Sequence, residues 1–139
     1  MLSATPFLLF DGNCAEAMTF YQQCLGGDLT LTKLSETPMK EMFPPEKHDR
    51  VINAHLKSGG LAISATDWMA SPEFDPVMGN MSAVFVESAD LDQLTAAFDK
   101  LARDADREHF QELHPMPFGI YGQLFDRYGV QWIFRGDSN

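Results

Sequence analysis

The sequence contains an internal repeat, which constrains the fold more than any other feature. The segment VINAHL-KSGG-LAISAT (residues 51–66) matches IYGQLF-DRYG-VQWIFR (residues 120–135) at a constant offset of 69 residues. In each copy, two apolar alternating stretches flank a four-residue connection that ends in glycine, a pattern typical of a β-hairpin. Few residues are identical, but the shared pattern predicts that the chain is built from two similar units.

A helix precedes each hairpin. The best-marked helix lies within FDGNCAEAMTFYQQCLGG (residues 10–27), where apolar residues recur every three or four positions. Asn13 is expected to be its N-cap, Glu16 to complete a capping box, and Gly26 to end it. The corresponding helix of the second half is expected to start after Asp90, with an apolar stripe of its own.

The strands complete a βαβββ order in each half. They are expected at 5–10, 28–34, 51–56 and 61–66, and again at 81–86, about 108–113, 120–125 and 130–135. The sequence therefore predicts an α+β fold, with two βαβββ modules forming a curved mixed sheet around a cleft. We expect a single domain over residues 1–139, composed of module one (about 1–67), a linker (about 68–79) and module two (about 80–139).

Two further expectations concern mobility and assembly. Residues 36–50, ETPMKEMFPPEKHDR, have no clean periodicity, so a long loop is expected there, and long loops in compact domains are often functional. Small modules leave edge strands and apolar helix faces that usually need further burial. A homodimer is therefore expected.

Composition excludes several classes of partner. The formal charge of −10 argues against binding to nucleic acid or to anionic membrane surfaces. No apolar run approaches the roughly 18 residues of a membrane span, and the N-terminus does not resemble a signal peptide. Cys14 and Cys24 lie on one helix, about 15 Å apart along its axis, so they cannot form a disulfide with each other. A cytoplasmic location is expected.

Strand alternation assigns side chains to the cleft. The cleft side of the first hairpin is expected to carry Asn53 opposite Ser64, and His55 opposite Ala62. An apolar floor and two loop aromatics are expected to complete a small-molecule site, with Phe10, Met81 and Phe85 in the floor and Trp68 and Phe118 closing it.

These segments resemble a known family. The paired βαβββ pattern is similar to that of the vicinal oxygen chelate superfamily, which includes glyoxalase I, extradiol dioxygenases and bleomycin-resistance proteins. FDGNCAEAMTFYQQCLGG, INAHLKSGGLAISATD and PFGIYGQLFDRYGVQW more closely resemble its PhnB-like branch. Some members carry a demethylubiquinone methyltransferase label. This sequence has no glycine-rich loop after a strand to hold a methyl donor, so the label is discounted here.

The resemblance also implies where a metal would bind. Metal-using members place four ligands on the first and last strands of each half, which correspond to about Pro6, Ser64, Met81 and Ile133. Such sites need histidine, glutamate or glutamine donors. None of the four residues is one, and shifting each position by one residue does not supply a donor. We therefore expect no metal ion and no other cofactor.

The sequence leaves open which reaction, if any, the expected site carries out. His55 is the best candidate for proton transfer, since imidazole titrates near neutral pH and the resemblance places a histidine here in many relatives. The alternative is a structural hydrogen bond. Asp67 is either a base or a turn-capping residue. Three functions remain: metal-independent binding of a small molecule, a metal-dependent lyase, isomerase or dioxygenase, and a resistance-type protein that sequesters a ligand. Whether the protein is an enzyme is not decided by the sequence.

Overall fold

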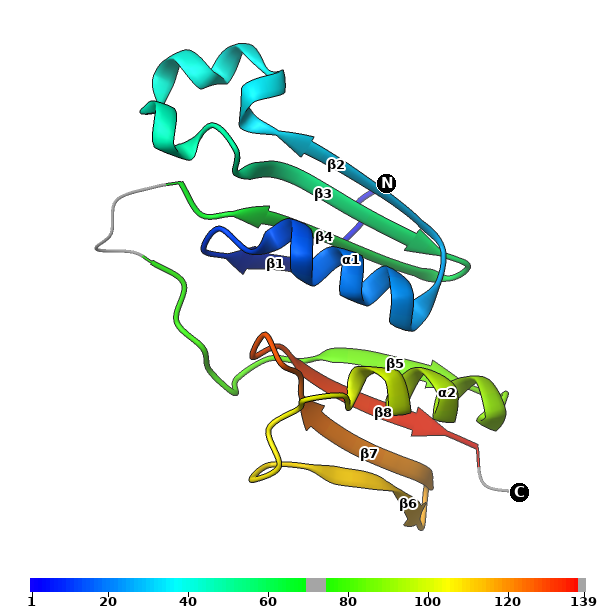
Figure 1. The fold of residues 1–139 in the computed structure, drawn as a ribbon. Helices are drawn as coiled ribbons and strands as arrows, with labels where there is room; N and C mark the ends of the chain where they lie inside the picture. The colour runs from blue at the N-terminus through cyan, green and yellow to red at the C-terminus, as the bar shows by residue number, and fades with distance from the viewer. Residues whose placement is uncertain (70–74, 138–139) are drawn as a thin grey trace. The chain divides into compact units, whose positions relative to one another are not determined.

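The computed structural model describes residues 1–69 and 75–137. The chain divides into two compact units, Met1–Val77 and Met78–Asn139. Each unit has a four-stranded mixed sheet with one α-helix packed on it (Figure 1). Residues 70–74, in the expected linker, lie outside the described residues. None of the described helices is long and apolar enough to cross a membrane.

The first unit has the expected element order. Its elements are β1 (Phe7–Phe10), α1 (Cys14–Leu25), β2 (Asp28–Lys33), β3 (Val51–Ser58) and β4 (Leu61–Asp67). The sheet order is β1-β4-β3-β2, and only the β1–β4 pair is parallel. The expected loop at 36–50 contains regular structure, because short 3₁₀ helices occupy Leu34–Glu36, Pro38–Met42 and Pro45–Lys47.

The second unit repeats this topology. Its elements are β5 (Val84–Ser88), α2 (Leu91–Leu101), β6 (Gln111–Met116), β7 (Gly119–Phe125) and β8 (Gln131–Gly136). The sheet order β5-β8-β7-β6 corresponds strand by strand to that of the first unit. The predicted α+β class and the two βαβββ modules are therefore confirmed.

The predicted start of β5 is wrong. The strand begins at Val84 rather than at residue 81, and Met81 precedes it with its side chain 99% exposed. In register, Phe85 lies beside Ile133 just as Phe7 lies beside Ser64. The first strands of the two halves thus correspond at an offset of 78 residues (7 to 85), not about 75.

The register of the first hairpin also differs from expectation. Ser58 still pairs with Leu61, so the connection is the two-residue turn Gly59–Gly60 rather than four residues. Gly59 has a φ of +58°, a left-handed conformation that favours glycine. As a result His55, not Asn53, lies opposite Ser64. A shift of two residues leaves every side chain on its predicted face, so the apolar pattern does not reveal it.

Helix α1 is capped by a residue distant in sequence. Asn13 makes no side-chain capping bond, contrary to the prediction. Instead Asp67, at the end of β4, accepts hydrogen bonds from the backbone N–H groups of Gly12 (2.8 Å) and Cys14 (3.0 Å) through Oδ1. Its Oδ2 accepts from Val51 N–H at 2.9 Å. This carboxylate, only 2% exposed, therefore joins the helix start, β3 and β4.

The burial of Asp67 has a consequence for its neighbour Cys14. Burial, and secondarily the negative charge of Asp67, raise the pKa of the Cys14 thiol from 9.0 to about 12. The thiol is therefore protonated at neutral pH, and it is not a nucleophile there. Cys14 and Cys24 are both free and buried, as expected for small helix residues facing a core.

A second buried carboxylate organises the other unit. Asp126 Oδ1 accepts from the N–H groups of Tyr128 (2.8 Å) and Val130 (3.0 Å), and its Oδ2 accepts from Trp132 Nε1 at 2.8 Å. It thereby fixes the β7–β8 turn against the core. The predicted N-cap of α2 is confirmed, since Asp90 Oδ1 accepts from Gln93 N–H at 3.1 Å. The core below α2 comprises Leu94, Phe98, Leu101, Leu124, Trp132 and Phe134.

Candidate functional site

Each sheet has one face covered by its helix and one face without a helix. We call the uncovered face of the first unit the first open face, consisting of Phe7, Leu9, Asn53, His55, Ser64 and Thr66. In the uncovered face of the second unit, the second open face, the corresponding residues are Phe85, Glu87, Tyr121, Gln123, Ile133 and Arg135. The strand registers place the members of each set on the same side of their sheet.

The first open face carries a polar pair at its centre. His55 on β3 and Ser64 on β4 are direct cross-strand neighbours, and His55 Nδ1 lies 3.0 Å from Ser64 Oγ. Both residues are half-buried. The other ring nitrogen, Nε2, has no hydrogen-bond partner among residues 1–69 and 75–137. The imidazole is thus oriented by Ser64 through one nitrogen, and the second nitrogen is available to a ligand.

Two apolar side chains that the sequence interpretation missed flank this pair. Phe7 lies beside Ser64 in the parallel register, and Leu9 lies beside Thr66. Their side chains are 57% and 42% exposed. Exposed apolar groups next to an oriented polar pair are typical of a surface that binds an organic molecule.

The predicted orientation of Phe10 is wrong. Phe10 pairs in register with Asp67, on the helix-covered side of the sheet, and its side chain is only 5% exposed. Because alternate residues face opposite sides, the open positions of β1 are Phe7 and Leu9. Asn53 is exposed on the first open face, but its neighbour on β2 is Thr32, and it does not lie opposite Ser64.

The second open face is aromatic and carries one ion pair. Phe85, 54% exposed, lies beside Ile133 as expected for an open position. Phe118, in the tight β6–β7 turn, packs its ring edge-on against Tyr121 at 5.9 Å between centroids. Arg135 pairs with Glu87 (3.0 Å) and donates to the Phe118 carbonyl (3.3 Å). The arginine therefore holds the turn against the sheet.

A hollow of about 630 Å³ lies at one end of the second unit. Its wall includes Gln123, Phe125 and Gln131 from β7 and β8, and His109, whose ring lies 5.8 Å from that of Phe125. The hollow therefore combines amide groups with an aromatic surface.

The other two predicted ligand-binding residues lie outside the strands. Met81 is fully exposed before β5. Trp68 directly follows β4, where its N–H donates to the Phe10 carbonyl (2.6 Å) and its carbonyl accepts from Arg50 Nη1 (2.6 Å). The indole Nε1 of Trp68 is buried and has no partner within the described part of the chain. Neither residue is placed next to His55 by the strand pairing.

Asp67 and His48 both have structural roles. All three hydrogen bonds to Asp67 come from buried or half-buried backbone donors, so its carboxylate acts as a cap and not as a base. His48 lies half-buried, with Nε2 at 2.9 Å from the Lys40 carbonyl oxygen and 3.1 Å from the Phe43 carbonyl oxygen. Since both partners accept, Nε2 carries the hydrogen, and His48 links the short 3₁₀ helices.

The residues at the metal-ligand positions of the superfamily do not fit a metal. The structure places Phe7 beside Ser64 and Phe85 beside Ile133 on the first and last strands of the two halves. Ser64 alone has a side-chain oxygen, and His55 already engages it. Among the described residues, no group of three or more histidine, cysteine, aspartate or glutamate side chains is arranged to hold a metal ion.

Comparison with known proteins gives a consistent result. The family model described as 3-demethylubiquinone-9 3-methyltransferase matches residues 3–134. The chain is similar to the protein PA1353 of Pseudomonas aeruginosa, with 26% identity, full coverage of both chains and a TM-score of 0.83. It is also similar to a PhnB protein from Bacillus cereus, with 25% identity, 97% and 99% coverage and a TM-score of 0.72.

A more distant structure shows the same fold. A glyoxalase/bleomycin resistance protein/dioxygenase domain from Frankia has 15% identity to this chain, 99% coverage of both chains and a TM-score of 0.66. At this identity the likeness concerns the architecture only.

Proposed function

The chain belongs to the PhnB-like family described as 3-demethylubiquinone-9 3-methyltransferase, and we propose that it binds a small organic molecule on its first open face without a metal ion. The observation that carries the proposal is the His55–Ser64 pair (3.0 Å) flanked by the exposed side chains of Phe7 and Leu9. We do not propose methyltransferase activity for this chain, because its sequence has no glycine-rich loop after a strand that could hold a methyl donor.

The chemistry of the first open face suggests what kind of molecule it binds. Phe7 and Leu9 offer an apolar surface for a flat ring or hydrocarbon, and burial of that surface provides most of the binding free energy. His55 Nε2 offers one directional hydrogen bond, which fixes the orientation of a polar group on the ligand. The neighbouring Thr66 hydroxyl already donates a hydrogen bond to the Ile52 carbonyl oxygen at 2.8 Å. A mainly aromatic compound with one polar substituent is therefore the best match.

Substitutions on the first open face test this proposal. In an NMR screen of aromatic fragments, those that bind are expected to shift the amide signals of Phe7, His55 and Ser64. Phe7→Ala is expected to weaken the best fragment at least about ten-fold, since loss of most of a buried aromatic contact costs more than 1.4 kcal/mol. His55→Ala is expected to weaken fragments with a polar substituent more than the unsubstituted ring.

Met42→Ala is the matched control, because it removes an apolar side chain that is 74% exposed and lies outside this face. It should leave fragment affinity unchanged. Fragments that bind equally to wild type and Phe7→Ala would refute the proposal. Conversion of a bound compound to product, lost in His55→Ala, would favour an enzyme over a ligand-sequestering protein of the resistance type. The homodimer and the cytoplasmic location stay predictions.

A further inference from the structure

The first open face has an apolar side and a polar side, because of the order of its strands. β1, at one edge of the sheet, contributes Phe7 and Leu9, whereas β3, two strands away, contributes Asn53 and His55 (Figure 1). Neighbouring strands lie about 4.8 Å apart, so the two sides are separated by about 10 Å. A ligand that contacts both sides would therefore have an apolar body at β1 and a polar group at β3.

Two polar groups on β3 are available to such a ligand. The Ser64 hydroxyl is engaged by His55 Nδ1, and the Thr66 hydroxyl donates to a backbone carbonyl. Asn53 is exposed, and its side-chain amide makes no hydrogen bond with any residue that the structure describes. Asn53 and the Nε2 atom of His55 thus remain. Residues i and i+2 of a strand project from the same side with Cα atoms about 6.7 Å apart, so one small polar group can contact both.

The two available groups offer one hydrogen-bond donor and one acceptor. The Ser64 hydroxyl, 3.0 Å from His55 Nδ1, can donate to that nitrogen, and in this tautomer the ring hydrogen lies on Nε2. His55 then donates through Nε2, and Asn53 accepts through Oδ1. A carboxamide has both a carbonyl oxygen and an N–H group, so it matches this pair. A carboxylate has no N–H group, and an ammonium group has no acceptor.

The centre of the first open face carries no ionic group. Its six residues include no lysine, arginine, aspartate or glutamate, and the two residues of β2 beside Asn53 and His55 are threonines. Beyond this centre, charged residues occur as neighbours of opposite sign. Lys57 lies beside Asp28 in the β2–β3 register, and Arg50 pairs with Asp11 at 2.8 Å. An ion bound at the centre would lose hydration without gaining a counter-charge, which favours an uncharged ligand.

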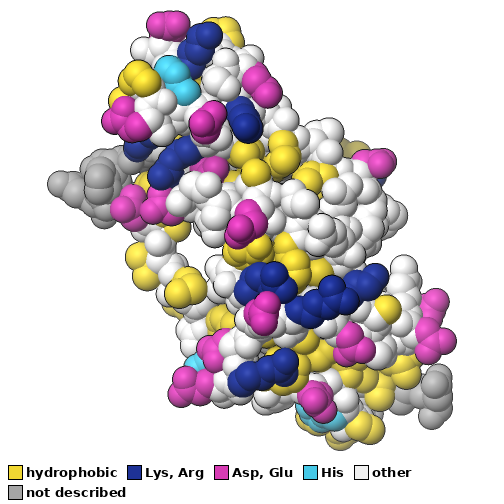
Figure 2. Space-filling view, in the orientation of Figure 1, with side chains coloured by type: hydrophobic (Ala, Val, Ile, Leu, Met, Phe, Trp, Pro, Cys, Tyr) yellow, Lys and Arg dark blue, Asp and Glu magenta, His cyan; other side chains and the backbone are white. Residues whose placement is uncertain are grey.

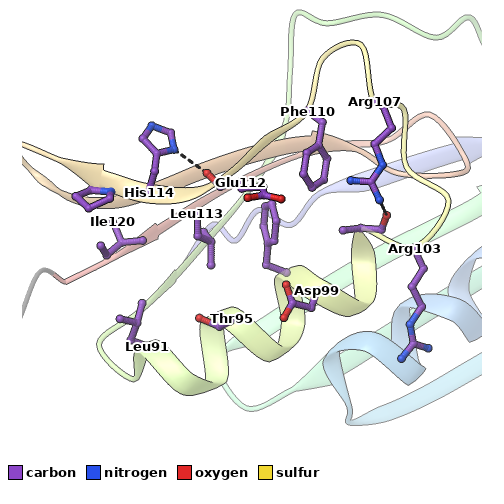
Figure 3. Close-up of a pocket in the computed structure, with 13 residues that line it drawn as sticks. Leu91, Thr95, Asp99, Arg103, Arg107, Phe110, Glu112, Leu113, His114 and Ile120 are labelled. Atoms are coloured by element: carbon purple, nitrogen blue, oxygen red, sulfur yellow. Dashed lines mark hydrogen bonds between the residues drawn. The ribbon is translucent and has the colours of Figure 1, made fainter.

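This absence of charge contrasts with other surfaces of the protein. Lysine, arginine, aspartate and glutamate side chains lie interspersed over the face seen in Figure 2. The groove between α2 and β6 is lined by both signs, with Arg103 and Arg107 as well as Asp99 and Glu112 (Figure 3). That groove does not indicate the charge of a ligand, whereas the centre of the first open face does.

We propose that the ligand of the first open face is an uncharged aryl carboxamide. Its carbonyl oxygen accepts a hydrogen bond from His55 Nε2, its N–H group donates to Asn53 Oδ1, and its ring lies against Phe7 and Leu9. This inference rests on the proposed function and names the ligand class of the same site. It also assigns Asn53 as the residue that distinguishes an amide from other polar groups, because Asn53 alone contacts the N–H group.

Four probes of similar size test the proposal: 3-phenylpropanamide, 4-phenylbutan-2-one, 3-phenylpropanoate and 3-phenylpropylammonium. The ketone has a methyl group in place of the amide NH₂, and the two ions have opposite charges. In NMR titrations of the full chain, the carboxamide is expected to bind about five-fold more tightly than the ketone, which is the effect of one hydrogen bond. It should also bind at least about five-fold more tightly than either ion. Signals of Phe7, His55 and the Asn53 side-chain NH₂ are expected to shift.

Substitutions separate the two hydrogen bonds. Asn53→Ala is expected to weaken 3-phenylpropanamide about five-fold and to leave the ketone within about two-fold, so the preference for the carboxamide disappears. His55→Ala should weaken both probes, because both carbonyl oxygens accept from Nε2. Asn13→Ala is the matched control, because Asn13 is an exposed asparagine at the start of α1 whose side chain makes no capping bond. It should leave the preference unchanged.

The outcomes distinguish this inference from the proposed function. Equal binding of carboxamide and ketone, with shifts at Phe7, His55 and Ser64, would overturn the inference and leave the proposed function intact. Equal or tighter binding of either ion would also overturn it, as would a preference for the carboxamide that persists in Asn53→Ala. If none of the four probes shifted Phe7, His55 or Ser64, both proposals would be contradicted.

Discussion

Replacing Asp67 with alanine is expected to lower the free energy of unfolding by about 3–5 kcal/mol. The carboxylate is 2% exposed and accepts three backbone hydrogen bonds, from Gly12, Cys14 and Val51. Alanine leaves these N–H groups without their partner, and each buried unsatisfied donor costs about 1–3 kcal/mol. Asparagine is expected to restore little, because its NH₂ group would face a donor at one of the two oxygen positions.

Chemical denaturation with hydrogen exchange at the three amides measures this effect. In Asp67→Ala the amides of Gly12, Cys14 and Val51 should lose protection before the rest of the first unit. Asp11→Ala is the control, because Asp11 forms an exposed ion pair with Arg50, and such pairs contribute at most about 1 kcal/mol. If both variants lost the same small amount of stability, Asp67 would not be the cap described above.

Substitution of Gly27 by alanine is the second change with a large expected effect. Gly27 follows α1 with a φ of +92°, a conformation that costs other residues about 1–2 kcal/mol. A Cβ there would also overlap the Lys57 carbonyl oxygen and approach Ser58 Cβ to 2.6 Å and Ser58 Cα to 2.8 Å. Since Lys57 pairs with Asp28, relief of this overlap must displace the start of β2. A total loss of about 3–5 kcal/mol is expected.

The variant Gly59→Ala separates the conformational cost of a positive φ from the cost of the steric overlap. Gly59 also has a positive φ, +58°, but apart from its chain neighbours no atom of residues 1–69 or 75–137 lies within 4 Å of the Cβ that alanine would add. Only the conformational cost of about 1–2 kcal/mol is then expected. Thermal or urea unfolding of both variants gives the comparison. If Gly27→Ala and Gly59→Ala lowered the free energy of unfolding equally, the close approach of β3 to Gly27 would contribute nothing to the effect of the substitution.

The sequence predicted the topology well because topology depends on pattern. The offset of 69 residues matches β4 to β8, but β3 corresponds to β7 at an offset of 68, because His55 lies opposite Ser64 and Gln123 lies opposite Ile133. Alternation within each strand correctly placed His55 and Ser64 on one face. Periodicity of this kind results from one buried and one open face, so it can be read without contacts. The helix cap at Asp90 was equally easy to predict from the sequence, because its hydrogen-bond partner Gln93 is only three residues away.

The parts that failed depend on contacts between distant residues. The cap of α1 is supplied by Asp67, 53 residues from Cys14, and no local signal distinguishes it from the expected Asn13. Short strands gave the other errors. β1 has only four residues, so the sides of Phe7 and Phe10 are decided by pairing with β4 and not by its own sequence. The same ambiguity placed β5 too early, at Met81.

These errors bear directly on the candidate site. Once β1 and β5 are placed, Phe7 and Phe85, and not Pro6 and Met81, are the first-strand residues beside Ser64 and Ile133, where the family resemblance implied metal ligands. Aromatic rings offer a metal ion no donor atom, and they are consistent with the organic ligand proposed above. The His55–Ser64 pair then remains as the polar element of the first open face.

Fragment binding in the presence and absence of metal ions would show whether the first open face binds organic molecules without a metal ion. The best aromatic fragment from the screen would be titrated into protein treated with excess EDTA, and into protein supplied with Mn²⁺, Ni²⁺ or Zn²⁺. We expect the same dissociation constant within about two-fold in every case, with amide shifts at Phe7, His55 and Ser64. Binding that appears only with metal, or a metal ion retained at close to one per chain, would contradict it.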